Sequence, residues 1–367
     1  MKNENYMTQA IKLAIKGKGY VNPNPLVGAV IVKDGEIIGT GYHEKYGSLH
    51  AERNALKNCI SSPSGGTMYV TLEPCCHYGK TPPCTEAIIE SGIKKVFIGS
   101  RDPNPKVMGK GIASLKEHGI DVIENFMKDE CDAINSIFFH YIKTKTPYVT
   151  MKYAMTMDGK IATVTGKSKW ISCEESRLDV QNDRHNLSAI MVGVGTVLVD
   201  DSLLTCRIQG GKNPIRVICD TNLRTPLSSR IVLTAKEVPT IIATSVSEES
   251  QLNLYRHRGC QLLVIPKKGD HIDLNFLMKS LGEMGIDSIL LEGGSTLNWS
   301  CLSAGIVNKT KVYIAPKIFG GASAKGPIGG IGVSLPSESF MLSNSIISRI
   351  GTDLIVESEV KYPCLQE

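Results

Sequence analysis

The chain has 367 residues, of which 42% are hydrophobic and 21% are charged. That composition excludes global disorder, and the length favours more than one folded domain. A net charge of +5 suits an anionic small substrate as well as nucleic acid, so it excludes neither. No apolar run is long enough to span a bilayer, and the N-terminus lacks the apolar core of a signal peptide. The 11 Cys residues are scattered and odd in number, unlike a disulfide framework, so we expect a cytoplasmic protein without membrane contact.

Helical and strand patterns alternate in the first part of the chain. Residues 27–32 and 37–39 are apolar and flank Asp34-Gly35, a dipeptide that tolerates the positive φ of a type I′ turn, which predicts a β-hairpin. Two predicted helices begin directly after loops, where the helix dipole favours thiolates. The other elements predicted here are helices over 6–15, 50–56 and 84–91, and strands over 68–71 and 95–99.

The composition turns polar at 144–147, where a proline interrupts any helix. We place a domain boundary there, which divides the chain into domains 1–146 and 147–367. Beyond it, strands alternate with helices, which indicates a largely parallel α/β sheet. The Gly-rich segment 319–332 is expected to be a mobile loop. The predicted strands are 148–155, 189–193, 215–219, 240–244, 261–265, 288–291 and 311–315, and the predicted helices are 174–184, 248–257 and 274–284.

One His, one Glu and two Cys occur in an order typical of zinc-dependent base deaminases. His50, Cys75 and Cys84 are the predicted ligands, because one imidazole and two thiolates leave a fourth tetrahedral position for water. Zinc lowers the pKa of such a water to about 7. Glu52, at the start of a predicted helix, is assigned the proton shuttle: it takes a proton from this water and delivers it to the ring nitrogen and the leaving amine.

Other interpretations stay open for several of these residues. A His-x-Glu pair occurs often by chance, and two Cys alone could be buried thiols or half of a structural zinc site. Cys76 is the nearest rival ligand, although the Pro-Cys order favours Cys75. His43 and His77 are interpreted as substrate contacts or as surface histidines.

The spacing of the cysteines departs from the common deaminase signature. That signature has two residues between its cysteines, whereas eight lie between Cys75 and Cys84. Residues 73–84 fit the pattern Glu-Pro-Cys-x-His-x-Gly-x-Thr-Pro-Pro-Cys, and the motifs at 22–28 and 47–52 match as well. In these motifs the chain resembles the bifunctional deaminase–reductases of riboflavin biosynthesis, and the resemblance extends over nearly the whole chain.

The resemblance implies a fold, a substrate and two cofactors. The fold would be a cytidine-deaminase-like α/β/α domain followed by a dihydrofolate-reductase-like α/β domain. The substrate would be a pyrimidine with a ribosylamino 5-phosphate, deaminated with Zn²⁺ and then reduced with NADPH from ribose to ribitol. The protein would be a homo-oligomer and bind no nucleic acid. Asn24 and Lys80 would join His43 and His77 as substrate contacts, although Asn24 is also typical of a turn and Lys80 of a solvated loop.

The second domain has no Gly-x-Gly-x-x-Gly motif after a first strand, so a standard Rossmann fold is not supported. An apolar strand at 288–291 runs into Glu292-Gly293-Gly294, where glycines and the N–H groups of a following helix can hold a phosphate. A tight strand-to-helix turn is the plainer interpretation. The reductase resemblance supports the phosphate interpretation through further matching stretches at 152–159, 168–171, 184, 193–207 and 292–294.

Carried over by position, the reductase resemblance assigns roles to single residues. Arg184 and Arg207 would offer forked donors to a phosphate. Lys152 and Asp200 would be catalytic, Lys152 through its charge and Asp200 by helping to protonate the sugar oxygen. Asp201 is the alternative to Asp200 and is also typical of a cap or a surface carboxylate.

The resemblance also implies which residues contact each ligand. Trp170 would cover the cofactor, unless it is a core residue. The implied NADPH contacts are Ala154, Trp170, Thr196, Asp200, Thr221, Gly294, Ser295, Thr296, Leu297, Asn298, Trp299 and Ser300, and the implied substrate contacts are Ser168, Arg184, Leu204, Arg207 and Glu292.

Two other functions fit parts of the pattern. A tRNA adenosine deaminase needs a basic, aromatic surface for stacked bases, and 6% aromatic residues with a mild charge do not supply one. A structural zinc module on an α/β binding domain would close its fourth metal position with protein. The order of the motif and the resemblance favour the bifunctional enzyme over both.

Overall fold

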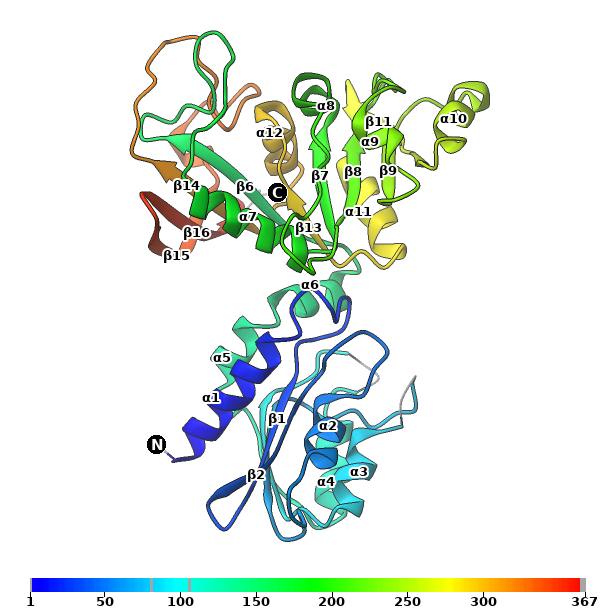
Figure 1. Cartoon of the computed structure of the whole chain (residues 1–367), viewed down its shortest axis with the longest axis vertical. Coiled ribbons are helices and arrows are strands. Elements are labelled where there is room, and N and C mark those ends of the chain that lie inside the picture. Colours follow the sequence, from blue (N-terminus) through cyan, green and yellow to red (C-terminus); the bar gives the residue numbers. More distant parts are fainter. Residues whose placement is uncertain (1, 80–81, 105–106, 364–367) are drawn as a thin grey trace. The chain divides into compact units, whose positions relative to one another are not determined.

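The computed structural model describes residues 2–79, 82–104 and 107–363. The chain divides into two compact units, Met1–Lys145 and Thr146–Glu367, each with its own sheet and core (Figure 1). Across the described ranges, no helix has both the length and the apolar character that a membrane span requires.

The first unit is built on a five-stranded mixed sheet with the order β2-β1-β3-β4-β5. β1 is antiparallel to β2 and β3, whereas β3, β4 and β5 run parallel. The predicted hairpin is confirmed, and Asp34 and Gly35 in its turn have φ of 50° and 83°. The strands are β1 (Gly28–Lys33), β2 (Glu36–Tyr42), β3 (Thr67–Leu72), β4 (Lys95–Ser100) and β5 (Asp121–Ile123).

Helices cover both faces of this sheet (Figure 1). Successive side chains on a strand point to opposite faces, so Val30 and Tyr69 pack with α1 and α5, while Ile31 and Met68 pack with α2, α3 and α4. The sequence pattern misses α5, because a polar hexamer that buries only Cys131 has no apolar periodicity. The helices are α1 (Lys2–Ile15), α2 (Ala51–Lys57), α3 (Cys84–Glu90), α4 (Lys110–Glu117), α5 (Lys128–Ala133) and α6 (Ser136–Thr144).

Glycines in β2 let α2 approach the sheet closely. A Cβ atom on Gly41 would lie 2.3 Å from the Ala55 backbone nitrogen and 2.5 Å from the Ala51 carbonyl oxygen, and one on Gly39 would lie 2.5 Å from the Ala55 oxygen. A side chain at Gly41 would therefore push the helix away from the strand. The start of α2, where His50 and Glu52 lie, is fixed by this contact.

The second unit is built on a nine-stranded sheet with the order β10-β9-β8-β7-β13-β6-β14-β16-β15. The neighbours from β10 to β14 are parallel, which confirms the predicted parallel sheet. β16 and β15 add an antiparallel end that the sequence pattern misses, because β15 is mostly exposed on both faces. The strands are β6 (Tyr148–Thr156), β7 (Ala189–Gly193), β8 (Ile215–Cys219), β9 (Thr240–Thr244), β10 (Gln261–Val264), β13 (Ser288–Leu291), β14 (Lys309–Ala315), β15 (Met341–Ile350) and β16 (Asp353–Lys361).

The helices of the second unit form two layers around the parallel strands. Met191 and Leu291 pack with α11 and α12 on one face, and Val192 and Ile218 pack with α8, α9 and α10 on the other. Segment 319–332 contains no helix or strand, as predicted for a loop. The remaining elements are α7 (Glu174–Asn186), α8 (Val194–Asp200), α9 (Arg230–Leu233), α10 (Glu249–Arg256), α11 (Leu274–Glu283), α12 (Ser295–Ser303), η1 (Pro336–Glu338) and the hairpin strands β11 (Lys267–Lys268) and β12 (His271–Ile272).

Candidate active sites

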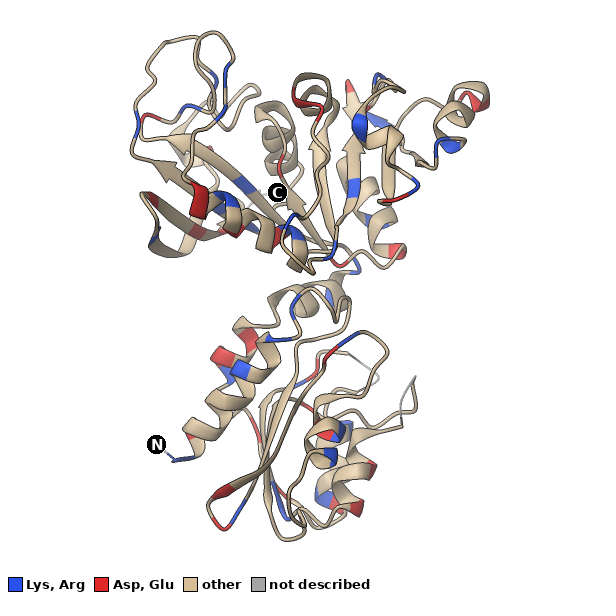
Figure 2. Cartoon of the chain, viewed as in Figure 1, with Lys and Arg blue, Asp and Glu red and all other residues tan. Residues whose placement is uncertain are grey.

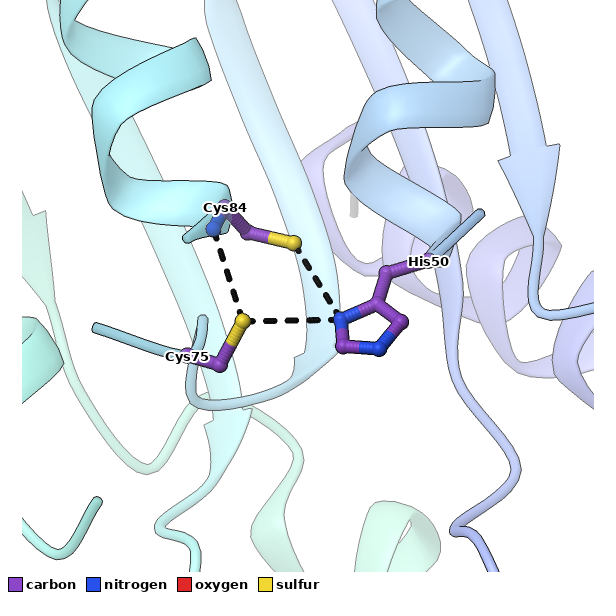
Figure 3. Close-up of side chains that lie close together, drawn as sticks. All are labelled: His50, Cys75 and Cys84. Carbon is purple, nitrogen blue, oxygen red and sulfur yellow. Dashed lines mark hydrogen bonds between the residues drawn. The ribbon is translucent and has the colours of Figure 1, made fainter. Parts of the chain in front are cut away.

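Three metal-ligating side chains converge in the first unit (Figure 3). The His50 Nδ1 atom lies 3.5 Å from the Cys75 sulfur and 3.4 Å from the Cys84 sulfur. All three potential ligand atoms lie within 4.8 Å of one another. Tetrahedral bonds from zinc of about 2.3 Å to sulfur and 2.0 Å to nitrogen would separate S and N by about 3.5 Å, so the residues fit this metal.

Loops and helix beginnings bring the three residues together. His50 is the N-cap of α2, Cys84 is the first residue of α3, and Cys75 lies in the loop after β3. The Cys84 backbone N–H lies 3.0 Å from the Cys75 carbonyl oxygen and 3.4 Å from its sulfur, so the loop folds back onto α3. Arg53 of α2 donates to the carbonyl oxygen of Pro83 at 2.7 Å, which ties the two helices together. Cys76, the rival ligand, is outside the cluster.

The protonation of these groups suits a dication. Hydrogen bonding with Cys84 foremost, and with His50, lowers the pKa of Cys75 to about 4 against the effect of burial. The pKa of Cys84 is raised by its hydrogen bond to Cys75 and by burial. Cys75 is therefore the thiolate of the pair and Cys84 the thiol in the absence of a metal. Glu52 is 3% exposed, and burial and the Cys75 charge raise its pKa to about 7. A bound dication would favour deprotonation of the second thiol as well.

The cluster forms part of the wall of a cavity of about 350 Å³. Glu52, Asn24, His43 and His77 line the same cavity, so the structure brings these sequence candidates together. The Asn24 side-chain nitrogen lies 3.1 Å from His43 Nε2. His43 is 3% exposed, so it is not a surface histidine. Lys80 lies outside the described residues.

Sequence reasoning misses several polar residues of this cavity wall, two of which follow β4. Asp102 and Asn104 both line it, from the loop that follows β4. The Asp102 carboxylate accepts the Asn104 N–H at 2.8 Å, and burial raises the pKa of Asp102 to about 6. They lie 18 and 20 residues beyond Cys84, and the parallel pairing of β3 with β4 brings their loop to the metal cluster.

Glu73 is another residue of this site to which the sequence analysis assigns no role, although it belongs to the cysteine motif. It is 3% exposed, and its two carboxylate oxygens accept four backbone N–H groups. A Cβ on Gly111 would lie 2.1 Å from the Pro74 carbonyl oxygen, so the metal loop and α4 are in direct contact. The four donors are those of Asp102 at 3.3 Å, Gly109 at 3.1 Å, Gly111 at 3.1 Å and Ile112 at 3.3 Å.

A charge cluster whose side chains are only 11–16% exposed lies at the carboxyl end of β13 in the second unit. Arg184 of α7 binds Glu292 through two hydrogen bonds of 2.7 and 3.1 Å, and the Lys152 Nζ lies 3.8 Å from the same carboxylate. Burial would raise the pKa of Glu292, but the charges of Arg184 and Lys152 lower it to about 2. The pKa of Lys152 is lowered, chiefly by burial.

These contacts bear on the expected role of Arg184 as a phosphate donor, which stays a prediction. Three of its N–H groups have partners within the protein, because Nε and Nη2 bind Glu292 and Nη1 donates to the Thr205 carbonyl oxygen at 3.0 Å. The other predicted phosphate donor is Arg207, whose side chain is exposed and whose backbone N–H donates to Gln181. Leu204, in contrast, is 4% exposed, with φ of 53°.

A second cavity, of about 450 Å³, lies beside α12. Thr196, Thr221, Thr296, Leu297 and Ser300 line it, so these five expected cofactor residues share one space. Two other expected cofactor residues have side chains that contact the protein itself, and their assignment stays a prediction. The first, Asn298, is buried and donates to the Pro327 carbonyl oxygen at 3.0 Å. The second, Trp299, packs edge-on against Phe340 and directly against Gly330.

The other residues that the reductase resemblance assigns to the ligands differ in exposure and in the elements that carry them. Trp170 is 64% exposed, so it is not a core residue, and the Arg177 guanidinium lies 4.6 Å from its ring centroid. Ala154 packs against the small cluster around Tyr313, and Ser168 is exposed. Gly294 is the N-cap of α12, and Ser295 is its first residue.

The two candidate aspartates differ in their surroundings. Asp200 is exposed at the last position of α8. Asp201, the alternative, accepts the Arg230 backbone N–H at 2.9 Å and thereby holds the start of α9. Asp201 therefore has a structural partner, as expected for a cap.

Fold and site together define a class of protein: a zinc-binding deaminase unit joined in one chain to an α/β reductase unit. Residues 1–100 match the model of the cytidine and deoxycytidylate deaminase zinc-binding region, and residues 147–356 match that of the RibD C-terminal domain. The first unit has the cytidine-deaminase-like α/β/α fold and the second the dihydrofolate-reductase-like fold, as the resemblance implied.

Relatives of known identity match along the whole chain. The riboflavin biosynthesis protein RibD of Actinobacillus pleuropneumoniae is 54% identical over 363 residues, which cover 99% of this chain and 96% of that protein. The RibD protein of Escherichia coli (strain K12) is 40% identical over 87% of this chain and 89% of its own length.

A solved structure agrees with these relatives. The diaminohydroxyphosphoribosylaminopyrimidine deaminase/5-amino-6-(5-phosphoribosylamino)uracil reductase of Thermotoga maritima superposes with a TM-score of 0.85 at 38% identity, covering 98% of this chain and 99% of that one. The chain belongs to the RibD family of riboflavin biosynthesis proteins, which are bifunctional deaminases and reductases.

The distribution of charged residues bears on the alternative of a nucleic-acid base deaminase. Within the described ranges, Lys and Arg are interspersed with Asp and Glu on the elements of both units (Figure 2). A nucleic-acid base deaminase would gather basic residues along one binding surface. The alternative of a tRNA deaminase is therefore not favoured.

Proposed function

We propose that the chain performs two consecutive reactions. The first domain, assigned to residues 1–146, hydrolyses the 2-amino group of 2,5-diamino-6-ribosylamino-4(3H)-pyrimidinone 5′-phosphate. The second, assigned to 147–367, reduces the ribosyl group with NADPH to give 5-amino-6-ribitylaminouracil 5′-phosphate. The observation that carries the proposal is the convergence of His50, Cys75 and Cys84 beside Glu52 at one cavity. The name of the similar Thermotoga maritima protein supports both the substrate class and the pairing of activities.

In the deaminase half, His50, Cys75 and Cys84 would hold Zn²⁺. When bound, this ion lowers the pKa of a water molecule and so supplies a nucleophile near neutral pH. Glu52 would accept one proton from the attacking water and pass it to the ring nitrogen. It would then move a second proton, from the hydroxyl added to the ring, to the departing amine, which leaves as ammonia. A carboxyl group whose pKa is about 7 can both take and give a proton at neutral pH.

The rest of the cavity would orient the pyrimidine. Asn24 presents an amide, the group type that forms paired hydrogen bonds with a heterocycle edge, and its contact with His43 holds it in place. His77 would contact the substrate from the loop that also carries Cys75, and Lys80 would contact the phosphate. Together these groups would place the amino-bearing carbon beside the metal cluster and Glu52.

In the reductase half, the nicotinamide cofactor supplies the hydride. Lys152 is a cation of the charge cluster, and burial lowers its pKa, which makes its proton easier to donate. Glu292, Arg184, Ser168, Leu204 and Arg207 would contact the substrate, with the two arginines offering donors to its phosphate. Asp200 would act from the exposed side.

We also propose a cytoplasmic homo-oligomer. The edge strand β15 exposes Met341, Leu342, Ile346 and Ile347, each at least 49% accessible. An exposed apolar edge strand of this kind is a liability unless another chain covers it. Sedimentation of the purified chain tests this part of the proposal.

One assay tests both reactions. The diamino-pyrimidinone phosphate is supplied with and without NADPH, while ammonia and nicotinamide absorbance are followed. We expect ammonia release in both cases and loss of nicotinamide absorbance only after deamination. Ammonia release that never leads to NADPH oxidation would reject the reductase assignment, and oxidation without ammonia would reject the proposed order.

A further inference from the structure

The second cavity has a wall that the expected cofactor residues do not account for. Asn222, Arg224 and His271 line it together with residues of α12. Gly193 and Cys219, the last residues of β7 and β8, line it as well, so it lies at the carboxyl ends of these two strands. Ligands of open α/β sheets bind at this edge.

Three features follow one another along the chain. Glu292, in the charge cluster, is followed by Gly293-Gly294 and then by α12, whose Thr296 lines the cavity that also contains Arg224. A Cβ on Gly293 would lie 3.0 Å from Asn298 Oδ1, so a side chain at this position would have to displace the Asn298 amide. A nicotinamide dinucleotide joins its reacting ring, its pyrophosphate and its adenosine in this order. With the reacting ring at the charge cluster and the pyrophosphate at the glycines, the adenosine would lie in the cavity that contains Arg224.

We propose that Arg224 binds the 2′-phosphate of the adenosine ribose and so sets the preference for NADPH over NADH. This proposal rests on the reductase function proposed above. The Arg224 side chain is exposed, and a guanidinium offers a planar fork of donors that matches phosphate oxygens. Arg224 and His271 are basic and only Asp270 is acidic among the ionisable side chains assigned to the cavity wall.

The nearby carboxylate supports the same preference. In Rossmann folds, a different kind of α/β sheet, the enzymes that use NADH bind the ribose 2′-hydroxyl with a carboxylate. Asp220 directly follows β8, but it is fully buried, and its Oδ2 accepts both the N–H and the hydroxyl of Thr225 at 2.7 Å. Its Oδ1 is buried as well, so neither oxygen is presented to the cavity. A 2′-phosphate would meet Arg224 without facing this negative charge.

The loop that carries Arg224 is held at several points. The Tyr255 hydroxyl of α10 donates to the Thr225 carbonyl oxygen at 2.6 Å. The Thr221 hydroxyl accepts the Ile272 N–H at 3.2 Å and thereby docks the hairpin that bears His271. Arg224 and His271 thus lie on a loop and a hairpin whose backbones are held in place by hydrogen bonds. Less conformational entropy of the protein is therefore lost when a ligand binds.

Titration calorimetry with two adenosine probes tests the proposal on the full chain. Adenosine 2′,5′-bisphosphate carries the 2′-phosphate, and 5′-AMP lacks it. We expect Arg224→Ala to weaken binding of the bisphosphate about tenfold to hundredfold, the usual loss for a hydrogen bond to a charged group, and to leave 5′-AMP unchanged. Arg258→Ala, at an exposed arginine outside the cavity, is the matched control and should change neither affinity.

Kinetic measurements distinguish the role of Arg224 from the proposed reductase reaction on which it rests. We expect Arg224→Ala to raise the KM for NADPH with little change in kcat and to leave the KM for NADH unchanged. Equal binding of both probes by the natural protein, or equal weakening of both by Arg224→Ala, overturns the assignment. If NADPH is not oxidised at all but the bisphosphate still binds through Arg224, the proposed reaction fails and the phosphate subsite stands.

Discussion

Glu52 acquires its proposed role from its position and not from its type. An exposed glutamate is ionised at neutral pH, whereas burial and the neighbouring Cys75 charge raise the pKa of Glu52 to about 7. The residue follows the N-cap of α2 by two positions, so the element that supplies the His50 ligand also supplies the proton carrier. The first turn of α2 therefore positions both the proposed metal ligand His50 and the proposed proton carrier Glu52.

Glu52→Gln should retain zinc and lose deamination. The amide keeps the size of the side chain but cannot carry the proton, and we expect ammonia release to fall about 10²- to 10⁴-fold. Metal analysis and ammonia assays measure the two properties on the same sample. Reduction of substrate that is already deaminated should be unchanged. Loss of the metal from this variant would show that Glu52 is a ligand and that its assigned role is wrong.

Sequence alone predicts residues whose roles depend on local motifs. His50, Cys75 and Cys84 are such residues, because their chemical types and order restrict the interpretation, and the structure brings their side chains together. The pairing of Arg184 with Glu292, 108 residues apart, cannot be read from a motif, since it depends on the packing of α7 against the end of β13. The same holds for Asn298, whose direction depends on Pro327.

At the level of elements, Glu73 joins the metal loop to the first turn of α4. Its carboxylate accepts N–H groups at the start of this helix, where intrahelical partners are missing, and that of Asp102 in the cavity wall. β3 supplies Glu73 at its carboxyl end, directly before Pro74 and Cys75. A movement of α4 would thus displace both the ligand loop and Asp102.

Glu73→Gln should impair substrate binding more than metal binding. The amide would direct an NH₂ group at backbone N–H donors, and leaving such buried donors unpaired costs about 1–3 kcal/mol. We expect a higher KM for the pyrimidine, with zinc content retained. Glu90→Gln, an exposed glutamate on α3, is the control. If the variant were less stable but its KM were unchanged, the hydrogen bonds of Glu73 would not position the cavity wall.

The charge cluster of Lys152, Arg184 and Glu292 connects β6, α7 and the end of β13. The folded pKa of Glu292 is about 2, below its ordinary value of 4.5. A depressed carboxyl pKa contributes stability that is fully present above pH 4.5 and is lost as the pH falls toward 2. The parallel strands themselves are predicted from sequence, but this cross-connection is not, because it depends on strand order in the sheet.

Glu292→Gln should flatten the acid dependence of stability in the second unit. A difference of this size corresponds to about 3 kcal/mol between pH 4.5 and 2, which the variant should lack. Both Trp residues, Trp170 and Trp299, belong to the second unit, so tryptophan fluorescence during urea unfolding follows that unit alone. Glu283→Gln, at an exposed position on α11, should keep the natural acid dependence. Parallel curves for Glu292→Gln and the natural protein would contradict the assigned pKa.

On the scale of the whole molecule, the chain combines two sheets with separate cores. The core clusters of the first unit contain residues of that unit only, as do those of the second. The polar stretch near Pro147 is the local signal for such a division. The antiparallel end formed by β15 and β16 is not evident from sequence, because mostly exposed strands have no clear alternation.

Separate cores predict that removal of zinc affects one activity only. Chelation should abolish ammonia release, because His50, Cys75 and Cys84 belong to the first unit and no residue of the second shares their cluster within the described ranges. Reduction of substrate that is already deaminated should continue, and the fluorescence transition of the second unit should not move. Re-addition of Zn²⁺ should restore ammonia release, which excludes damage by the chelator. If chelation stopped both reactions or shifted that transition, the metal would stabilise the whole chain, and the two units would not be independent.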